Sequence, residues 1–203
     1  MNKCAQFTLK PSLLHWEAAK RIVKYLLESW KHGILFRRDL REAEQYIDTL
    51  VGYTDADYAG NSNDRKSTTG WIYLFNGSPI SWASKKQPLI ARSSMESELI
   101  AGSFTSIEGT WLIRLAKDFK HDLAPIHLHT DNQPFIFYSK NDISNTRTKH
   151  IDTHYHYTCD QISKGNIELS YISTPDNLAD ILTKPLSLRK HTSLLERLGV
   201  KHV

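Results

Sequence analysis

The order of short apolar runs and longer amphipathic stretches is the feature that most constrains how this chain folds. Three runs rich in β-branched and aromatic residues follow one another closely, at 51–58, 70–75 and 79–84, and an Asn-Gly turn separates the last two. Because their connections are short, these runs predict three strands that pair as an antiparallel meander. A stretch with apolar residues at helical spacing, 93–119, predicts a long helix after them.

The second half of the chain alternates between strand and helix patterns. A fourth strand is predicted at 126–130, then a short helix through Tyr138, a helix at 146–163 and a fifth strand at 167–173. The remainder reads as mostly helical. The resulting order, βββαβα(α)βα, predicts an α/β fold: a mixed five-stranded sheet with helices on both faces.

A separate helix is predicted near the N-terminus. Ser12 is a plausible N-cap, and a charged segment that follows the helix, 31–45, reads as a hairpin or linker. Apolar residues at helical spacing form a stripe along it: Trp16, Ala19, Val23, Leu26 and Trp30. We therefore expect a helical segment with linker at 1–48, the α/β domain at 49–186 and a helical tail at 187–203.

Composition limits the compartment and the partners. The formal net charge is +4 and the pI about 9.0, which permits a polyanionic partner without requiring one. Cys4 and Cys159 are the only cysteines, so neither a disulfide framework nor a zinc ribbon is expected. The sequence has no signal-peptide pattern and no apolar run of membrane-spanning length. The expected location is cytoplasmic or nuclear, without secretion or a membrane partner.

Four carboxylates stand at the ends or starts of four predicted elements: Asp55, Glu98, Asp131 and Asp180. In this topology the first and fourth strands can be neighbours while the long helix crosses them, so the four acids can converge. Their mutual repulsion is tolerated mainly when cations are bound between them, and hard cations such as Mg²⁺ prefer carboxylate oxygens. Such a site suits phosphodiester hydrolysis. Taken singly, each acid is also explained as a helix cap or strand-end residue.

Seven segments resemble the blocks of one family. They are VGYTDADYAG (51–60), DRKSTTG (64–70), ISWASKKQ (80–87), SSMESE (93–98), TDNQ (130–133), RTKHID (147–152) and LADILTKPL (178–186). Together they resemble the RNase H domain of copia-type LTR retrotransposon Pol polyproteins. The stretch 15–27 resembles the end of the reverse transcriptase that precedes this domain.

The resemblance implies an RNase H-like fold and endonucleolytic cleavage of the RNA strand in RNA:DNA hybrids, leaving a 3′-hydroxyl and a 5′-phosphate. It aligns the four acids with the family's metal ligands for two Mg²⁺ ions, which Mn²⁺ can replace. Asp55 and Asp131 would contact both ions, and Glu98 and Asp180 one each. By this likeness the location is a cytoplasmic virus-like particle or the nucleus.

Two near alternatives and one departure accompany the resemblance. Glu96 competes with Glu98, but Glu98 directly precedes the apolar pair that opens the helix. Asp57 shares a strand face with Asp55 and lies about 7 Å further along, so it is expected outside the ligand set. Many RNase H enzymes have a histidine in the loop before the last acid, whereas this chain has 171–176 without one.

Small polar side chains beside the acids are candidates for contacts with the hybrid, whose minor groove is read through 2′-hydroxyl groups. They are Ser93, Ser94, Asn132 and Gln133. Arg147, Lys149 and His150, at the start of a predicted helix, are candidates for phosphate contacts. Helix capping and a solvated helix face explain the same residues. A zinc site formed by His150, His154, His156 and Cys159 is disfavoured, because their helical spacing does not make them converge.

Two rival functions remain to be compared with the nuclease. A polymerase is excluded by length and by the spacing within 53–57. A catalytically idle fragment that binds nucleic acid or a protein is the open alternative, and the apolar stripe of the N-terminal helix would then bind a partner or fold back on the domain. A reverse transcriptase that contacts this helix is a further candidate partner.

Overall fold

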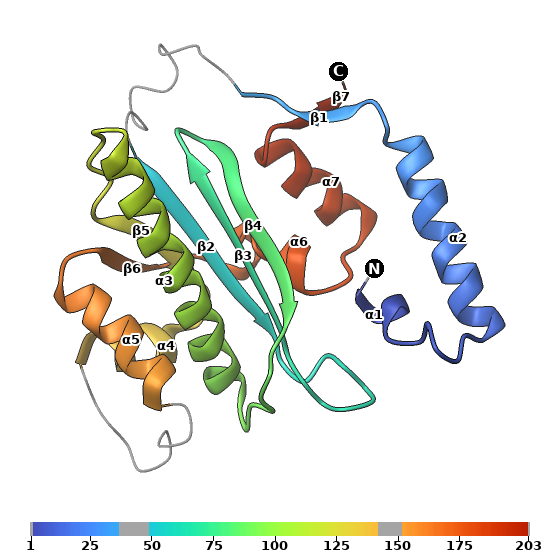
Figure 1. Ribbon diagram of the computed structural model, residues 1–203, viewed down its shortest axis with the longest axis horizontal. Helices are drawn as coiled ribbons and strands as arrows, with labels where there is room; N and C mark the ends of the chain where they lie inside the picture. The colour runs from blue at the N-terminus through green and yellow to red at the C-terminus, as the bar shows by residue number, and fades with distance from the viewer. Residues whose placement is uncertain (1, 37–48, 142–151, 203) are drawn as a thin grey trace. The chain divides into compact units, whose positions relative to one another are not determined.

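The computed structural model describes residues 2–36, 49–141 and 152–202 (Figure 1). The chain divides into two compact units. One comprises residues 1–35 together with 200–203, and the other comprises residues 36–199. The predicted boundary near residue 48 lies outside the described residues. No helix in the described ranges is both long and apolar enough to cross a membrane.

The smaller unit contains α1 (Asn2–Ala5), α2 (Leu13–Glu28), and a two-stranded antiparallel sheet of β1 (His32–Ile34) and β7 (Val200–His202). Ser12 precedes α2, and its backbone N–H donates to His15 Nδ1 at 3.0 Å. No residue of α2 is buried, and Trp16, Val23 and Leu26 of the predicted apolar stripe are exposed, as is Trp30, which follows the helix. The predicted helical tail is wrong for its last residues, because β7 is a strand. The sequence did not predict β7, because its pairing partner β1 is remote in the chain and a strand of three residues shows no periodicity.

The larger unit is built on one five-stranded sheet. Its strands are β2 (Leu50–Asp57), β3 (Thr68–Phe75), β4 (Ser78–Lys86), β5 (Ile126–Thr130) and β6 (Ile167–Tyr171). Their order is β4-β3-β2-β5-β6, with antiparallel pairing among the first three and parallel pairing from β2 to β5 and β6. The predicted mixed sheet, with an antiparallel meander and later crossover strands, is confirmed.

Helices connect and cover these strands. They are α3 (Ser94–Asp118), α4 (Gln133–Asn141), α5 (Asp152–Ser163), the 3₁₀ turn η2 (Thr174–Asp176), α6 (Asp180–Thr183) and α7 (Leu188–Arg197). Figure 1 shows α3 running across the sheet with α4 and α5 beside it. The described part of the helix predicted at 146–163 is α5, and its predicted first residues lie outside the described ranges.

Strand alternation decides which side chains meet which helix. Thr54 and Tyr73 face α3: Thr105 Oγ1 donates to Thr54 Oγ1 at 2.9 Å, and the Tyr73 hydroxyl donates to the Thr105 carbonyl at 2.7 Å. Asp55, which follows Thr54, and Gly70, which pairs with Asp55 across the strands, therefore face the opposite side of the sheet, where they meet residues of α6. Helices cover both faces, as predicted. The core against α3 consists of two apolar clusters, around Leu128 with Phe135 and around Tyr73 with Leu112.

Candidate metal centre

Asp55 lies near the end of β2, the central strand of the sheet. It lies on β2, directly opposite Gly70 on β3, and it is 2% exposed. The Thr183 hydroxyl donates to Asp55 Oδ2, and Lys184 Nζ lies 3.6 Å from the same oxygen. A carboxylate this deeply buried is costly unless cations or hydrogen-bond donors surround it.

Glu98 reaches Asp55 from the first turns of α3. Ser93 caps the helix, because its side chain accepts a hydrogen bond from the Glu96 N–H at 3.2 Å. Glu98 Oε1 accepts a hydrogen bond from the Ala56 N–H at 3.2 Å. Glu98 Oε2 is buried and has no hydrogen-bond partner within the described structure. An unsatisfied buried carboxylate oxygen is rare in proteins and indicates that another group belongs beside it.

Asp131 completes a cluster of three carboxylates. It follows β5, the parallel neighbour of β2, and is half-buried. One oxygen each from Asp55, Glu98 and Asp131 can be chosen so that all three lie within 4.8 Å of one another. Three elements remote in the sequence thus bring three carboxylates together. Among the described residues, no other group of three or more potential metal ligands comes together in this way.

Asp180, the fourth predicted acid, lies outside this group of three. It is the first residue of α6 and fully buried. Its carboxylate is paired with two ammonium groups: Lys184 Nζ lies 2.7 Å from Oδ1, and Lys190 on α7 contacts Oδ2. Lys184 lies within reach of both Asp55 and Asp180, so it links the fourth acid to the other three.

Gly70 allows α6 to approach the sheet. A Cβ atom at this position would lie 2.6 Å from Thr183 Cγ2, 3.0 Å from Leu182 Cβ and 3.1 Å from the Ala179 carbonyl oxygen. A larger side chain would therefore push α6 away from β3. Because Thr183 contacts Asp55, glycine at this position sets the distance between the last acid and the first.

The pKa values of Asp55, Glu98 and Lys184 are perturbed. Burial raises the pKa of Asp55 to about 6, against the opposing effects of the Thr183 hydroxyl and the Lys184 ammonium. Burial, and then the charges of Asp55 and Asp131, raise the pKa of Glu98 well above its usual range. Burial alone would lower the pKa of Lys184, but its hydrogen bond to Asp180 and the nearby carboxylates outweigh burial and raise it. The charged forms of Asp55 and Glu98 are thus disfavoured in the ion-free site.

This donor set fits a divalent metal ion. The ligand atoms are carboxylate oxygens, which Mg²⁺ and Mn²⁺ prefer over nitrogen or sulfur. One of them, Glu98 Oε2, is buried without a partner among the described residues. A cation at the cluster would satisfy this oxygen and would counter the burial and the repulsion that raise the pKa values of Asp55 and Glu98.

Glu96 and Asp57, the near alternatives, have other roles. Glu96 Oε2 accepts a hydrogen bond from the Arg92 N–H at 2.6 Å, which ties the loop to the start of α3. The Asp57 side chain lies against Gly60 in the turn after β2. Neither acid belongs to the group formed by Asp55, Glu98 and Asp131.

The predicted hybrid-contacting residues divide into two groups. Ser93 and Asn132 cap helices: Asn132 Oδ1 accepts a hydrogen bond from the Phe135 N–H at 2.8 Å. Ser94 and Gln133 are exposed at the starts of α3 and α4. All four lie next to Glu98 or Asp131 in the sequence. Arg147, Lys149 and His150 lie outside the described residues.

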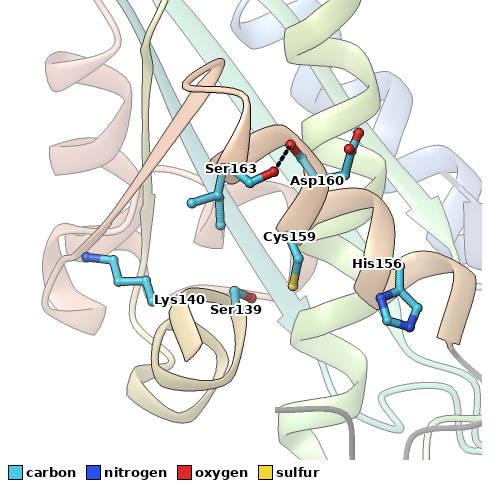
Figure 2. Close-up of a pocket in the computed structure, with 7 residues that line it drawn as sticks. Ser139, Lys140, His156, Cys159, Asp160 and Ser163 are labelled. Carbon is cyan, nitrogen blue, oxygen red and sulfur yellow. Dashed lines mark hydrogen bonds between the residues drawn. The ribbon is translucent and has the colours of Figure 1, made fainter. Parts of the chain in front are cut away.

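A pocket of about 360 Å³ between α4 and α5 is lined by two members of the disfavoured zinc set, His156 and Cys159 (Figure 2). In Figure 2 Cys159 points toward Ser139, whereas the ring of His156 lies further along α5. His154 Nδ1 is 3.0 Å from Ser103 Oγ, and its ring packs on Phe104. Among the described residues, His154, His156 and Cys159 belong to no group that could bind a metal ion. His150 is not among the described residues.

The loop before Asp180, where a histidine is absent, is fastened to α7. The Arg197 guanidinium donates to Asp176 Oδ1 at 3.2 Å and to the Asp176 carbonyl at 3.0 Å. Lys190 Nζ also donates to the Thr174 carbonyl at 3.3 Å. Sequence reasoning missed Thr183, Lys184 and Lys190 as neighbours of the acids, although the first two lie within the motif at 178–186. Their spacing from Asp180, three and four residues, was the available signal.

Comparisons with known proteins agree with the fold. No family model matches the chain. A retrovirus-related Pol polyprotein from transposon RE2 of Arabidopsis thaliana is 35% identical over 98% of this chain, and one from transposon TNT 1-94 of Nicotiana tabacum is 36% identical over 97%. The chain spans only 13% and 14% of the lengths of these relatives. The secreted RxLR effector protein 161 of Plasmopara viticola is 41% identical over 53% of this chain and 72% of that protein.

Solved structures show which fold this is. An RNase H1 isolated from compost, LC11, covers 68% of this chain and 94% of its own with a TM-score of 0.53 at 12% identity. The N-terminal RNase H domain of Rv2228c from Mycobacterium tuberculosis covers 73% and 96%, with a TM-score of 0.50 at 10% identity. By sequence the chain belongs to the retrovirus-related Pol polyproteins of copia-type transposons, of which it matches a segment, and its larger unit has the RNase H fold.

Proposed function

We propose that this chain is a ribonuclease H that cleaves the RNA strand of RNA:DNA hybrids during retrotransposon reverse transcription. The convergence of Asp55, Glu98 and Asp131, with one buried oxygen left unsatisfied within the described structure, carries the proposal. The RNase H fold and the Pol polyprotein relatives support it. The chain's natural setting would be a cytoplasmic virus-like particle or the nucleus.

Divalent ions would be bound by Asp55, Glu98 and Asp131, with Asp180 as a further ligand, and we propose two Mg²⁺ ions, which Mn²⁺ can replace. Such ions supply an activated water and stabilise the leaving oxygen in phosphodiester hydrolysis. The protein's part is to fix the carboxylates: β2 and β5 are adjacent in the sheet, and the Ala56 N–H orients Glu98. Ser94 and Gln133, exposed at the starts of α3 and α4, are our candidates for hybrid contacts.

Cleavage of labelled substrates tests this function. We expect the purified chain with Mg²⁺ to cut the RNA strand of a hybrid, leaving RNA duplex and DNA duplex intact, and to lose this activity in EDTA. Asp131→Asn should reduce cleavage at least about a hundredfold, because it removes a carboxylate ligand of the divalent ions that would stabilise the transition state. Asp160→Asn is the matched control. Asp160 lies on α5, 2.6 Å from Lys164, and exposed ion pairs contribute little.

A binding module without catalysis is the second candidate. The exposed apolar side chains on and just after α2, which include Trp16 at 61% and Trp30 at 73% exposure, favour a protein-interaction role for the smaller unit. Reverse transcriptase is the partner that we propose for it. Wild-type chain that binds the hybrid in Mg²⁺ but never cuts it would favour this module over the nuclease.

A further inference from the structure

Lys184 bridges two acids that come from different elements. Its ammonium lies 2.7 Å from Asp180 Oδ1 and 3.6 Å from Asp55 Oδ2. The Asp180 side chain is fully buried and that of Asp55 is 3% exposed, whereas that of Lys184 is 32% exposed. The lysine thus reaches from the surface into a site where two buried carboxylates would otherwise repel each other.

The charges of the site favour one divalent ion over two. With the four acids ionised, Asp55, Glu98, Asp131 and Asp180 carry four negative charges, and Lys184 and Lys190 carry two positive charges in contact with them. The net charge of minus two equals the charge that one divalent cation neutralises. A second divalent cation would leave an excess of positive charge in a largely buried site unless an ammonium group moved away.

The two lysines differ in how they are fixed. Lys190 contacts Asp180 and also donates to the Thr174 carbonyl at 3.3 Å, so it joins α7 to the loop that precedes α6. The interactions described for the Lys184 ammonium are all with carboxylates, those of Asp180 and Asp55. Because its partners are the acids themselves, Lys184 is the cation that a metal ion would displace.

We propose that Lys184 acts as an internal counter-ion that competes with the second divalent cation. This inference rests on the proposed function. According to this proposal, the first ion binds at Asp55, Glu98 and Asp131 while the Lys184 ammonium remains paired with Asp180. The second ion binds only when that ammonium leaves Asp180. Lys184 is then a positioning residue that sets the affinity for the second ion.

Binding of Mn²⁺ to the full chain, measured by electron paramagnetic resonance of the free ion at pH 8 without nucleic acid, tests this directly. We expect the wild type to bind one ion tightly and a second much more weakly. Lys184→Met keeps the length of the side chain and removes the charge, and it should tighten binding of the second ion at least about tenfold. Lys184→Arg keeps the charge and should behave like the wild type.

Lys86→Met is the matched control. The Lys86 side chain is 30% exposed and lies 2.5 Å from Asp64, outside the acid cluster, so its removal should leave both Mn²⁺ affinities unchanged. Circular dichroism shows whether each variant is folded, and Lys184→Gln provides a second neutral variant if Lys184→Met is not. Neutral variants that bind the second ion no better than the wild type overturn the inference, as does a wild type that binds two ions equally well. Absence of any Mn²⁺ binding to wild type and variants would instead remove the proposed metal centre and the nuclease with it.

Discussion

The stability of the ion-free chain should fall as the pH rises through the range in which Asp55 ionises. Burial raises the pKa of Asp55 from 3.8 to about 6. Between these values the folded chain binds a proton that the unfolded chain has released. The contribution of protonated Asp55 to the free energy of unfolding is therefore fully present below about pH 4 and is lost as the pH rises through about 6. A shift of about two pKa units corresponds to about 3 kcal/mol of unfolding free energy.

Urea denaturation in EDTA at pH 4, 5, 6 and 7, followed by circular dichroism, measures this loss. Other groups titrate in the same range, so the informative quantity is the difference between wild type and Asp55→Asn. We expect the wild type to lose about 3 kcal/mol relative to the variant between pH 4 and pH 7. Saturating Mg²⁺ should reverse the loss, since a bound cation replaces the proton. A difference that stays constant or grows in favour of the wild type as the pH rises would refute the reasoning.

Three further variants test the local geometry. Gly70→Ala should lower the free energy of unfolding, measured by urea denaturation, by about 1–3 kcal/mol, because the new Cβ would lie 2.6 Å from Thr183 Cγ2. A stability equal to that of the wild type would contradict the close approach of α6. Ser93→Ala should lower the free energy of unfolding by about 1 kcal/mol, because it removes the cap on α3. Ser94→Ala, at an exposed position, should lower it by less than about 0.5 kcal/mol, and equal losses in the two variants would argue against the cap. Glu98→Gln should raise the melting temperature in EDTA, because it replaces a buried carboxyl group whose raised pKa shows that its charged form is disfavoured. The same variant should abolish the additional stabilisation by Mg²⁺, and an undiminished response to Mg²⁺ would exclude Glu98 as a ligand.

The convergence of three acids was predictable because topology and periodicity determine it. Asp55 and Asp131 lie at or near the ends of β2 and β5, which the βββαβ order makes neighbours, and Glu98 follows one turn after the N-cap of α3. The choice of Glu98 over Glu96 depended on the family pattern. In the structure Glu96 binds the backbone of Arg92, and Glu98 lies in the cluster.

The environment of Asp180 was not predictable from the sequence. Lys184 and Lys190 have long flexible side chains, and which acid each contacts depends on how α6 and α7 pack rather than on a repeating pattern. Strand β7 was missed because a strand this short is defined by its partner, β1, at the other end of the chain. Sequence patterns report local preference and burial, whereas these contacts arise from the tertiary arrangement.

Crystals soaked with Mn²⁺ and measured for its anomalous scattering provide the most direct test of the central claim, that Asp55, Glu98 and Asp131 together bind a divalent ion. We predict an anomalous peak that contacts a carboxylate oxygen from each of the three residues, Glu98 Oε2 among them. No peak at this cluster in millimolar Mn²⁺, with the three side chains placed as described, would contradict the account.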